Sequence, residues 1–406
     1  MGLGSGCRAP TRTMSGPRFD LVEEENQVIG VDKLNLEDAL ELHRRFGRYV
    51  QVEFPSPLHP KSYHLRAGSY VGQAGLSGGG QLYLGAKVPL ANLFGMLEYA
   101  YQFKAVKWWD RLTPCAHLGE AFEYLAGLLA RNALELASKG VYQAYVKEEG
   151  DLPFVRGRVL PKSAQPVHIR CRYARQTTDL LDNRIVLWTL WKALCWPWEQ
   201  AHTQQMVRRA FAAWGGAAAL LPVTPQQCAD RLYHRLNNDY QPLHALCRFF
   251  LEHSGPALGR GDHRLIAFMI YMPGLFEAFV AQWLRRHLPK VYHLDVQYRA
   301  ELEGNRRLAF RMDAVIKEAH NGRVVAVLDT KYKRDPEPAE SDIQQVVAYA
   351  VQLHTGKGLL VYPAARDSPA LIQVGDIQIH ALAFDLGGNL DGAGKAFKIA
   401  LLQALR

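Results

Sequence analysis

The stretch RMDAVIKEAHNGRVVAVLDTKYKRDPEPAESDIQQVVAY, residues 311–349, is the most informative part of the sequence. It contains two apolar, strand-like runs. Asp313 lies near the start of the first run, and Asp329-Thr330-Lys331 ends the second. Residues two apart on a strand point to the same face, so we expect Asp329 and Lys331 to share one. Asp313, on the neighbouring strand, is expected to approach Asp329 across the pair.

These residues predict a metal site that hydrolyses phosphodiesters. Two carboxylates and the Thr330 carbonyl form an oxygen-rich set suited to Mg²⁺, with Mn²⁺ as a substitute. Such a metal acidifies a bound water and offsets charge on the phosphate. Lys331 would position that water and stabilise the oxyanion. This order and spacing is that of a PD-(D/E)xK nuclease. A lone D-x-K triplet is common on surface strands, so the prediction depends on the whole order.

Three further residues are candidates for the same catalytic site. Glu277, on a preceding helix-like segment, is predicted to ligate the metal directly or through water, although an acidic residue on an amphipathic helix is commonplace. Gln345 and Tyr349 lie four apart on one helical face, where they could orient Lys331 or contact the phosphate. Asp342 is expected to be a helix N-terminal residue and not a ligand.

The fold class predicted is α+β or α/β, with several domains. In residues 263–406 a helix over 264–288 precedes three strands, a helix and a further strand. This α-β-β-β-α-β order is the layout of a restriction-endonuclease-like core, with a mixed sheet flanked by helices.

The rest of the chain is divided by its pattern into three parts. Residues 1–17 are expected to be a flexible tail, because they lack the apolar run of a signal peptide. Residues 18–104 are predicted to form an α+β module that binds a partner. Residues 105–262 are predicted to be mainly helical, with a β-hairpin-like insertion. Local signals support this: Asn35 should cap one helix and Gly140 should end another.

Composition limits the function classes. The 406 residues are too many for one ordinary core, and the net charge of +9 favours a polyanionic partner. The six cysteines show no CxxC pair, which favours a reduced, cytoplasmic setting and gives no support for zinc. No run approaches the roughly 20 apolar residues of a membrane span.

One segment imitates a nucleotide-binding loop. In GGNLDGAGKA, residues 387–396, Asn389 stands where the first glycine of a Walker A loop must be. Ala396 replaces the Ser or Thr that contacts Mg²⁺. We therefore expect no nucleotide to bind this chain, so nucleotide energy would have to come from another polypeptide.

With these residues in hand, the chain resembles the McrC family, the nuclease subunit of the modification-dependent McrBC restriction systems. The resemblance covers most of residues 25–365 and rests on the combination of its motifs. Those motifs are Arg156-Gly157-Arg158, Thr178-Asp179-Leu180-Leu181-Asp182-Asn183-Arg184, Leu275-Phe276-Glu277-Ala278-Phe279-Val280, Asp313, Leu328-Asp329-Thr330-Lys331-Tyr332-Lys333 and Asp342-Ile343-Gln344-Gln345 through Tyr349.

The resemblance implies a partner and a mode of action. Members of the family act with McrB, a hexameric AAA+ GTPase that recognises methylated cytosine. They bind the central pore of that ring through their N-terminal half, stimulate GTP hydrolysis and cut double-stranded DNA in the assembled complex. One departure is Met312, where the family usually has proline before Asp313, and proline does no chemistry there.

Three functions remain open from the sequence. The first is a Mg²⁺-dependent DNA endonuclease subunit of a GTP-driven restriction complex. The second is a non-cutting protein that plugs and activates a AAA+ ring, because roughly 260 residues lie outside the nuclease core. The third is a self-sufficient nuclease that needs no nucleotide.

Overall fold

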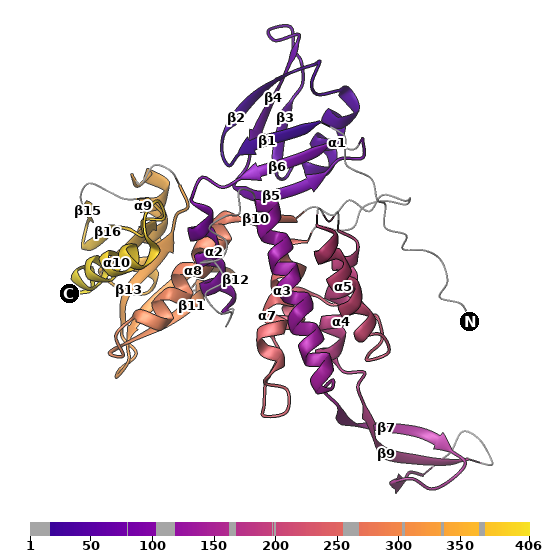
Figure 1. Ribbon diagram of the computed structural model, residues 1–406. Coiled ribbons are helices and arrows are strands. Elements are labelled where there is room, and N and C mark those ends of the chain that lie inside the picture. Colours follow the sequence, from indigo (N-terminus) through magenta and orange to yellow (C-terminus); the bar gives the residue numbers. More distant parts are fainter. Residues whose placement is uncertain are drawn as a thin grey trace. The chain divides into compact units, whose positions relative to one another are not determined.

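The structure is a computed structural model (Figure 1). It describes residues 17–78, 80–102, 118–161, 168–196, 198, 200–254, 268–302, 305–333, 337–364 and 370–406. Residues 1–16 of the tail predicted over 1–17, and the boundaries at 104/105 and 262/263, lie outside these residues. The described chain divides into two compact units, one within Gly119–Ala267 and one combining Thr13–Leu118 with Phe268–Arg406. The separation of 18–104 from 263–406 as distinct domains stays a prediction.

The N-terminal part of the second unit contains two small sheets. One has the order β1(Arg18–Val22), β6(Gln81–Gly85), β5(Tyr70–Gly75), β10(Phe268–Tyr271). The other has the order β2(Asn26–Gly30), β4(Ser62–Ala67), β3(Val50–Glu53), and helix α1(Leu36–Phe46) packs on β3. Asn35 caps α1 as predicted, because its side chain accepts a hydrogen bond from the Asp38 N–H at 2.7 Å.

The helix predicted over 264–288 is wrong in its first part. Residues 268–271 form β10, antiparallel to β5, and helix α8(Met272–His287) begins only at Met272. The short apolar run before Pro273 suits a helix or a buried strand equally well. The partner strand decides between the two structures. A Cβ at Gly72 of β5 would lie 1.9 Å from the Phe268 carbonyl oxygen, so the absence of a side chain there lets β10 pair with β5. Residues 264–267 lie outside the described chain.

The C-terminal part is a six-stranded mixed sheet. Its order is β11(Tyr292–Leu302), β12(Asn305–Glu318), β13(Val324–Thr330), β14(Lys357–Tyr362), β16(Ile377–Ala383), β15(Ala370–Val374). Strands β11 to β13 pair antiparallel, whereas β13, β14 and β16 pair parallel. Helices α9(Glu340–Gln352) and α10(Leu390–Leu405) complete the region. The predicted order α-β-β-β-α-β is confirmed.

Both parts of the second unit share a core. Helix α2(Leu90–Tyr101) packs on α8, where the rings of Tyr99 and Phe279 lie 5.5 Å apart. The buried Asn92 amide donates hydrogen bonds of 2.7 Å to the carbonyls of Leu386 and Gly388. The N-terminal elements therefore pack directly on the region that carries the predicted catalytic residues.

The first unit is mainly helical, as predicted. Its elements are α3(Leu118–Lys139), α4(Leu181–Leu194), α5(Ala201–Ala213), α6(Pro225–Ala229), α7(Tyr240–His253) and a sheet of β7(Ala144–Leu152), β9(Ile169–Thr177) and β8(Arg158–Val159). The three-stranded sheet projects from the helices (Figure 1). Helix α3 ends at Gly140, whose φ of +95° suits glycine. No helix in the described residues is long and apolar enough to cross a membrane.

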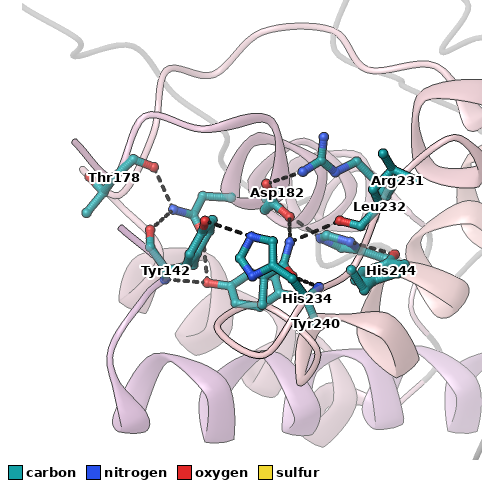
Figure 2. A network of polar contacts seen from close by, with 11 residues as sticks. Tyr142, Thr178, Asp182, Arg231, Leu232, His234, Tyr240 and His244 are labelled. Carbon is teal, nitrogen blue, oxygen red and sulfur yellow. Dashed lines mark hydrogen bonds and ion pairs between the residues drawn. The ribbon is translucent and has the colours of Figure 1, made fainter. Parts of the chain in front are cut away.

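A buried asparagine fixes the base of this projecting sheet (Figure 2). The Asn183 amide donates to the Tyr142 carbonyl at 2.8 Å and to the Thr178 carbonyl at 2.5 Å. Tyr240 donates its hydroxyl to Asn183 Oδ1 at 2.7 Å and accepts the Tyr142 N–H at 2.7 Å. Because Tyr142 precedes β7 and Thr178 follows β9, Asn183 ties both ends of the sheet to helix α4.

The same network extends to Asp182, a buried carboxylate (Figure 2). Asp182 accepts hydrogen bonds from Arg231 at 2.7 Å and from Asn237 at 3.1 Å. His244 Nε2 donates to the Asp182 carbonyl at 2.9 Å, and burial lowers the pKa of His244 to about 4. His244 is therefore neutral at pH 7. The ion pair between Asp182 and Arg231 and the hydrogen bonds around it explain how so many polar groups are tolerated in a core.

Replacing Asn183 tests whether this network holds the first unit together. Asn183→Ala removes three hydrogen bonds and leaves two part-buried carbonyls without this donor, so we expect the free energy of unfolding to fall by about 3 kcal/mol. Chemical denaturation of the full chain measures it. The matched control is Asn238→Ala at an exposed position, where the change should be within about 0.5 kcal/mol. Equal effects of the two variants would contradict the assignment.

Candidate active site

Strands β12 and β13 bring the two predicted carboxylates together. Ala314 pairs with Leu328, so Asp313 and Asp329 occupy the next position of the ladder. Asp313 Oδ2 accepts hydrogen bonds from the Thr330 N–H at 2.7 Å and from the Thr330 hydroxyl at 2.6 Å. Asp329 is 3% exposed, so its charge is held in a poorly solvated position.

Lys331 is held by partners on two elements. Its Nζ lies 2.7 Å from Asp329 Oδ2 and donates to Gln345 Oε1 at 2.7 Å. Gln345 Nε2 in turn donates to the Tyr349 hydroxyl at 2.6 Å, and that hydroxyl donates to the Arg311 carbonyl at 2.9 Å. The structure therefore places Gln345 and Tyr349 of α9 where they orient Lys331.

Glu277 of α8 joins the carboxylates. Burial, a hydrogen bond to Asp313 and the charges of Asp313 and Asp329 raise the pKa of Glu277 to about 8, with burial the largest cause. Burial and the Asp313 charge also raise the pKa of Asp329 to about 6, against the opposing effect of Lys331. Burial lowers the pKa of Lys331, but its acidic neighbours, Asp329 first, leave it raised overall. The site thus concentrates negative charge around one ammonium group.

The donor set fits a hard divalent cation. Carboxylate and carbonyl oxygens from Asp313, Asp329 and Thr330 are the ligands that Mg²⁺ and Mn²⁺ prefer, and Glu277 is the fourth predicted ligand. Among the described residues, no group of three or more His, Cys, Asp and Glu is arranged to hold a metal ion. Two carboxylates with one main-chain oxygen need no such group, because Mg²⁺ usually keeps several waters.

Gln297 is a site residue that the sequence did not reveal. It lies on β11 between the pairs Val296–Ala314 and Tyr298–Met312, which places it opposite Asp313. Its amide donates to Glu277 Oε1, and its φ is +51°, a left-handed value that is uncommon for a residue other than glycine. Strained backbone of this kind is concentrated at functional sites. A glutamine within a strand carries no local signal that would have singled it out.

Tyr332 connects the N-terminal sheets to the site and was also missed. It follows Lys331, is 6% exposed and donates its hydroxyl to the buried Glu23 at 3.2 Å. Lys87 Nζ lies 4.3 Å from the centre of its ring, and the ring of Phe276 lies 5.8 Å away. The residue after Lys331 thus contacts the residue before Glu277.

Asp342 plays the structural part predicted for it. It lies in the first turn of α9, and the Ala339 N–H donates to its Oδ2 at 3.3 Å. Its other contacts are ion pairs of 2.7 Å with Lys333 and 3.9 Å with Lys331, and a hydrogen bond of 3.3 Å from Tyr362. A carboxylate at this end of a helix is favourable because it satisfies free N–H groups.

The contact between Glu23 and Tyr332 gives a pH-dependent prediction. Burial raises the pKa of Glu23 to about 7 against the opposing effect of Lys87. The stability that this carboxyl contributes is complete below its ordinary value of about 4.5 and is lost as pH rises through 7. Glu23→Gln keeps an acceptor for Tyr332 and cannot ionise. We therefore expect the free energy of unfolding of the variant, relative to that of wild type, to rise by roughly 2 kcal/mol from pH 5 to pH 8.

Denaturation midpoints at both pH values measure this difference. The control is Glu53→Gln, which makes the same change at an exposed position on β3 and should leave the free energy of unfolding within about 0.5 kcal/mol of wild type. A Glu23→Gln difference that is the same at pH 5 and pH 8 would contradict the assignment.

Comparison with known proteins identifies the family. Residues 65–363, more than half of the chain, match the family model described as McrBC 5-methylcytosine restriction system component. A chain from the refined half-complex of a tetradecameric assembly of Thermococcus gammatolerans McrB AAA+ hexamers with bound McrC covers 95% of this chain. The match spans 99% of that chain at 18% identity with a TM-score of 0.59, which shows a shared fold.

A second match is to the Thermococcus gammatolerans McrBC complex, with 18% identity, 67% of this chain and 88% of that chain covered, and a TM-score of 0.42. No curated protein matches the sequence. The family match confirms the resemblance found in the sequence: this chain belongs to the family of McrBC 5-methylcytosine restriction system components.

Proposed function

We propose that this chain is the Mg²⁺-dependent DNA endonuclease subunit of a McrBC-like restriction complex. The observation that carries the proposal is the meeting of Asp313 on β12, the buried Asp329 on β13 and Lys331 just after β13, with Lys331 Nζ 2.7 Å from Asp329 Oδ2. The net charge of +9 agrees with a polyanionic substrate.

Each residue has a defined task in this proposal. Asp313, Asp329 and the Thr330 carbonyl would hold the metal, which supplies an acidified water and offsets charge on the phosphate. Lys331 stabilises the negative charge that develops on the phosphate oxygens. Gln345 and Tyr349 keep Lys331 in place through the chain of hydrogen bonds that ends at the Arg311 carbonyl.

The proposed partner is a McrB-like AAA+ GTPase hexamer. The solved structure that shares the fold comes from McrB AAA+ hexamers with bound McrC. The Walker-like segment of this chain begins helix α10, where Asn389 accepts the Gly392 N–H at 2.9 Å as an N-cap. A helix cap in place of a phosphate-binding loop supports assigning GTP hydrolysis to the partner, stimulated by this chain.

A non-cutting activator of a AAA+ ring is the second candidate. A mainly helical unit with a projecting, exposed sheet lies outside the nuclease-like region, and it is large enough to bind a partner. A stand-alone nuclease is the third candidate, and it differs from the first only in needing no nucleotide.

Cleavage of methylated plasmid DNA tests the proposal. The full chain, a McrB-like AAA+ partner, GTP and Mg²⁺ should together cut, and EDTA should abolish cutting. Asp329→Asn and Lys331→Met should each slow cleavage by roughly 100-fold or more, because each removes charge from the reacting centre. The matched controls, Asp376→Asn and Lys395→Met, change the same charges at exposed positions and should cut at the wild-type rate.

The GTPase rate of the partner separates the candidates. If the chain is the nuclease subunit and also an activator, Asp329→Asn should lose cleavage and keep GTPase stimulation within about twofold, since the ion pair lies inside the nuclease-like region. Stimulation by a wild-type chain that never cuts would favour the activator. Wild-type cleavage at full rate without nucleotide would favour the stand-alone nuclease.

A further inference from the structure

A groove runs along strand β11 beside the candidate active site. Its volume is about 770 Å³, and it lies between the end of α8 and the strand. Its lining includes Arg285, His293, Gln297, Tyr298 and Arg299. The groove is therefore predominantly polar, with two guanidinium groups on its walls.

The acidic residue of the groove is already neutralised. Asp295 lines the groove and forms an ion pair of 2.7 Å with Lys317. His293 Nε2 lies 3.0 Å from the same carboxylate. The charge of Asp295 is thus balanced by Lys317 and His293. In the described part of the chain, Arg285 and Arg299 have no acidic partner.

A third arginine strengthens the positive charge. Arg299 and Arg311 are direct cross-strand partners on β11 and β12, and both are exposed. Like charges directly opposite each other destabilise a sheet. Within the residues that the structure describes, neither guanidinium forms an ion pair that would offset this repulsion. An anion placed between the two would remove it.

The groove meets the candidate active site at Gln297, and Arg311 on the neighbouring strand β12 extends it toward Asp313. Gln297 lines the groove and donates its amide to Glu277. Arg311 comes two residues before Asp313 on β12, and Tyr349 binds its carbonyl at 2.9 Å. An anion held by Arg299 and Arg311 would therefore lie along the strands that lead to the reacting centre.

We propose that this groove, lined by Arg285 and Arg299 and extended by Arg311, binds the phosphodiester backbone of the DNA duplex next to the phosphate that is cut. Guanidinium groups bind phosphate oxygens in a planar, bidentate way, which suits them to fix a strand. The inference rests on the proposed nuclease function and adds the surface that positions the substrate. Phosphate contacts of this kind set register and carry no sequence information.

Salt-dependent binding of a DNA duplex tests the groove directly. The full chain is titrated into a fluorescent DNA duplex of about 20 base pairs, which suffices to span the groove. EDTA is present so that no cleavage occurs. The titration is repeated at several salt concentrations between about 50 and 200 mM. Each phosphate contact contributes about 0.9 to the slope of log affinity against log salt. Arg299→Gln with Arg311→Gln should lower the slope by about 2 and weaken binding at least tenfold at low salt.

Two further variants control for charge and for folding. Arg323→Gln removes one charge from an exposed arginine that is paired with Glu318, and it should leave the slope unchanged. Arg299→Glu should keep the fold, because it creates an attractive cross-strand pair with Arg311, and it should still weaken DNA binding. An unchanged slope in the double variant, or an equal loss in Arg323→Gln, would overturn the proposal.

A competition experiment shows whether the groove binds the phosphates of DNA, free phosphate or a nucleotide. Unlabelled duplex should displace the probe at micromolar concentration, whereas inorganic phosphate or GTP at the same concentration should not. Displacement by GTP that is lost in Arg299→Glu would overturn the proposal in favour of a nucleotide site. The binding assay involves no cleavage, so a chain that binds through the groove and never cuts would contradict only the nuclease function.

Discussion

The ion pair between Lys331 and Asp329 is the interaction on which the candidate site depends. Asp329 is 3% exposed, and the Asp313 carboxylate is its neighbour in the ladder. Removing one partner of a buried pair leaves an uncompensated charge, which is strongly unfavourable. Lys331 is held beside Asp329 by Gln345 of α9, which accepts a hydrogen bond from the same ammonium group. The site therefore depends on the sheet and the helix together.

Local patterns were enough to find the centre of the site and not its edges. Asp329 and Lys331 follow from the period of two on a strand, and Asn35 follows from the chemistry of helix caps. Strand β10 could not be predicted in this way, because a short apolar run suits a helix or a strand equally well. The distant strand β5 decides between the two. The contact of Tyr332 with Glu23 joins residues 309 positions apart, and no local pattern encodes such a pair.

The N-terminal sheets and the candidate site belong to one compact unit. Strand β10 pairs within an N-terminal sheet and continues directly into α8, which carries Glu277. Glu23 and Lys87 contact Tyr332 next to Lys331. A displacement of these sheets would therefore reach both the carboxylate on α8 and the ammonium group of Lys331, the residue that follows β13. The base of the projecting sheet in the other unit is fixed differently, by the Asn183 amide bridging two carbonyls and by Tyr240, which binds both Asn183 and the Tyr142 N–H.

Three unfavourable features lie together around β11 and β12. The first is the crowding of carboxylates, which together with burial raises the pKa of Glu277 to about 8. The second is the left-handed backbone at Gln297, and the third is the pair of like charges on Arg299 and Arg311, which face each other across the two strands. Each one lowers stability by itself, and sequences usually remove such costs where nothing requires them. A cation among the carboxylates and a polyanion along the arginines would relieve the two electrostatic costs at once. Because those two ligands would carry opposite charges and lie along adjacent strands, binding one would favour binding the other, which is the arrangement that the proposed metal-dependent cleavage of DNA requires.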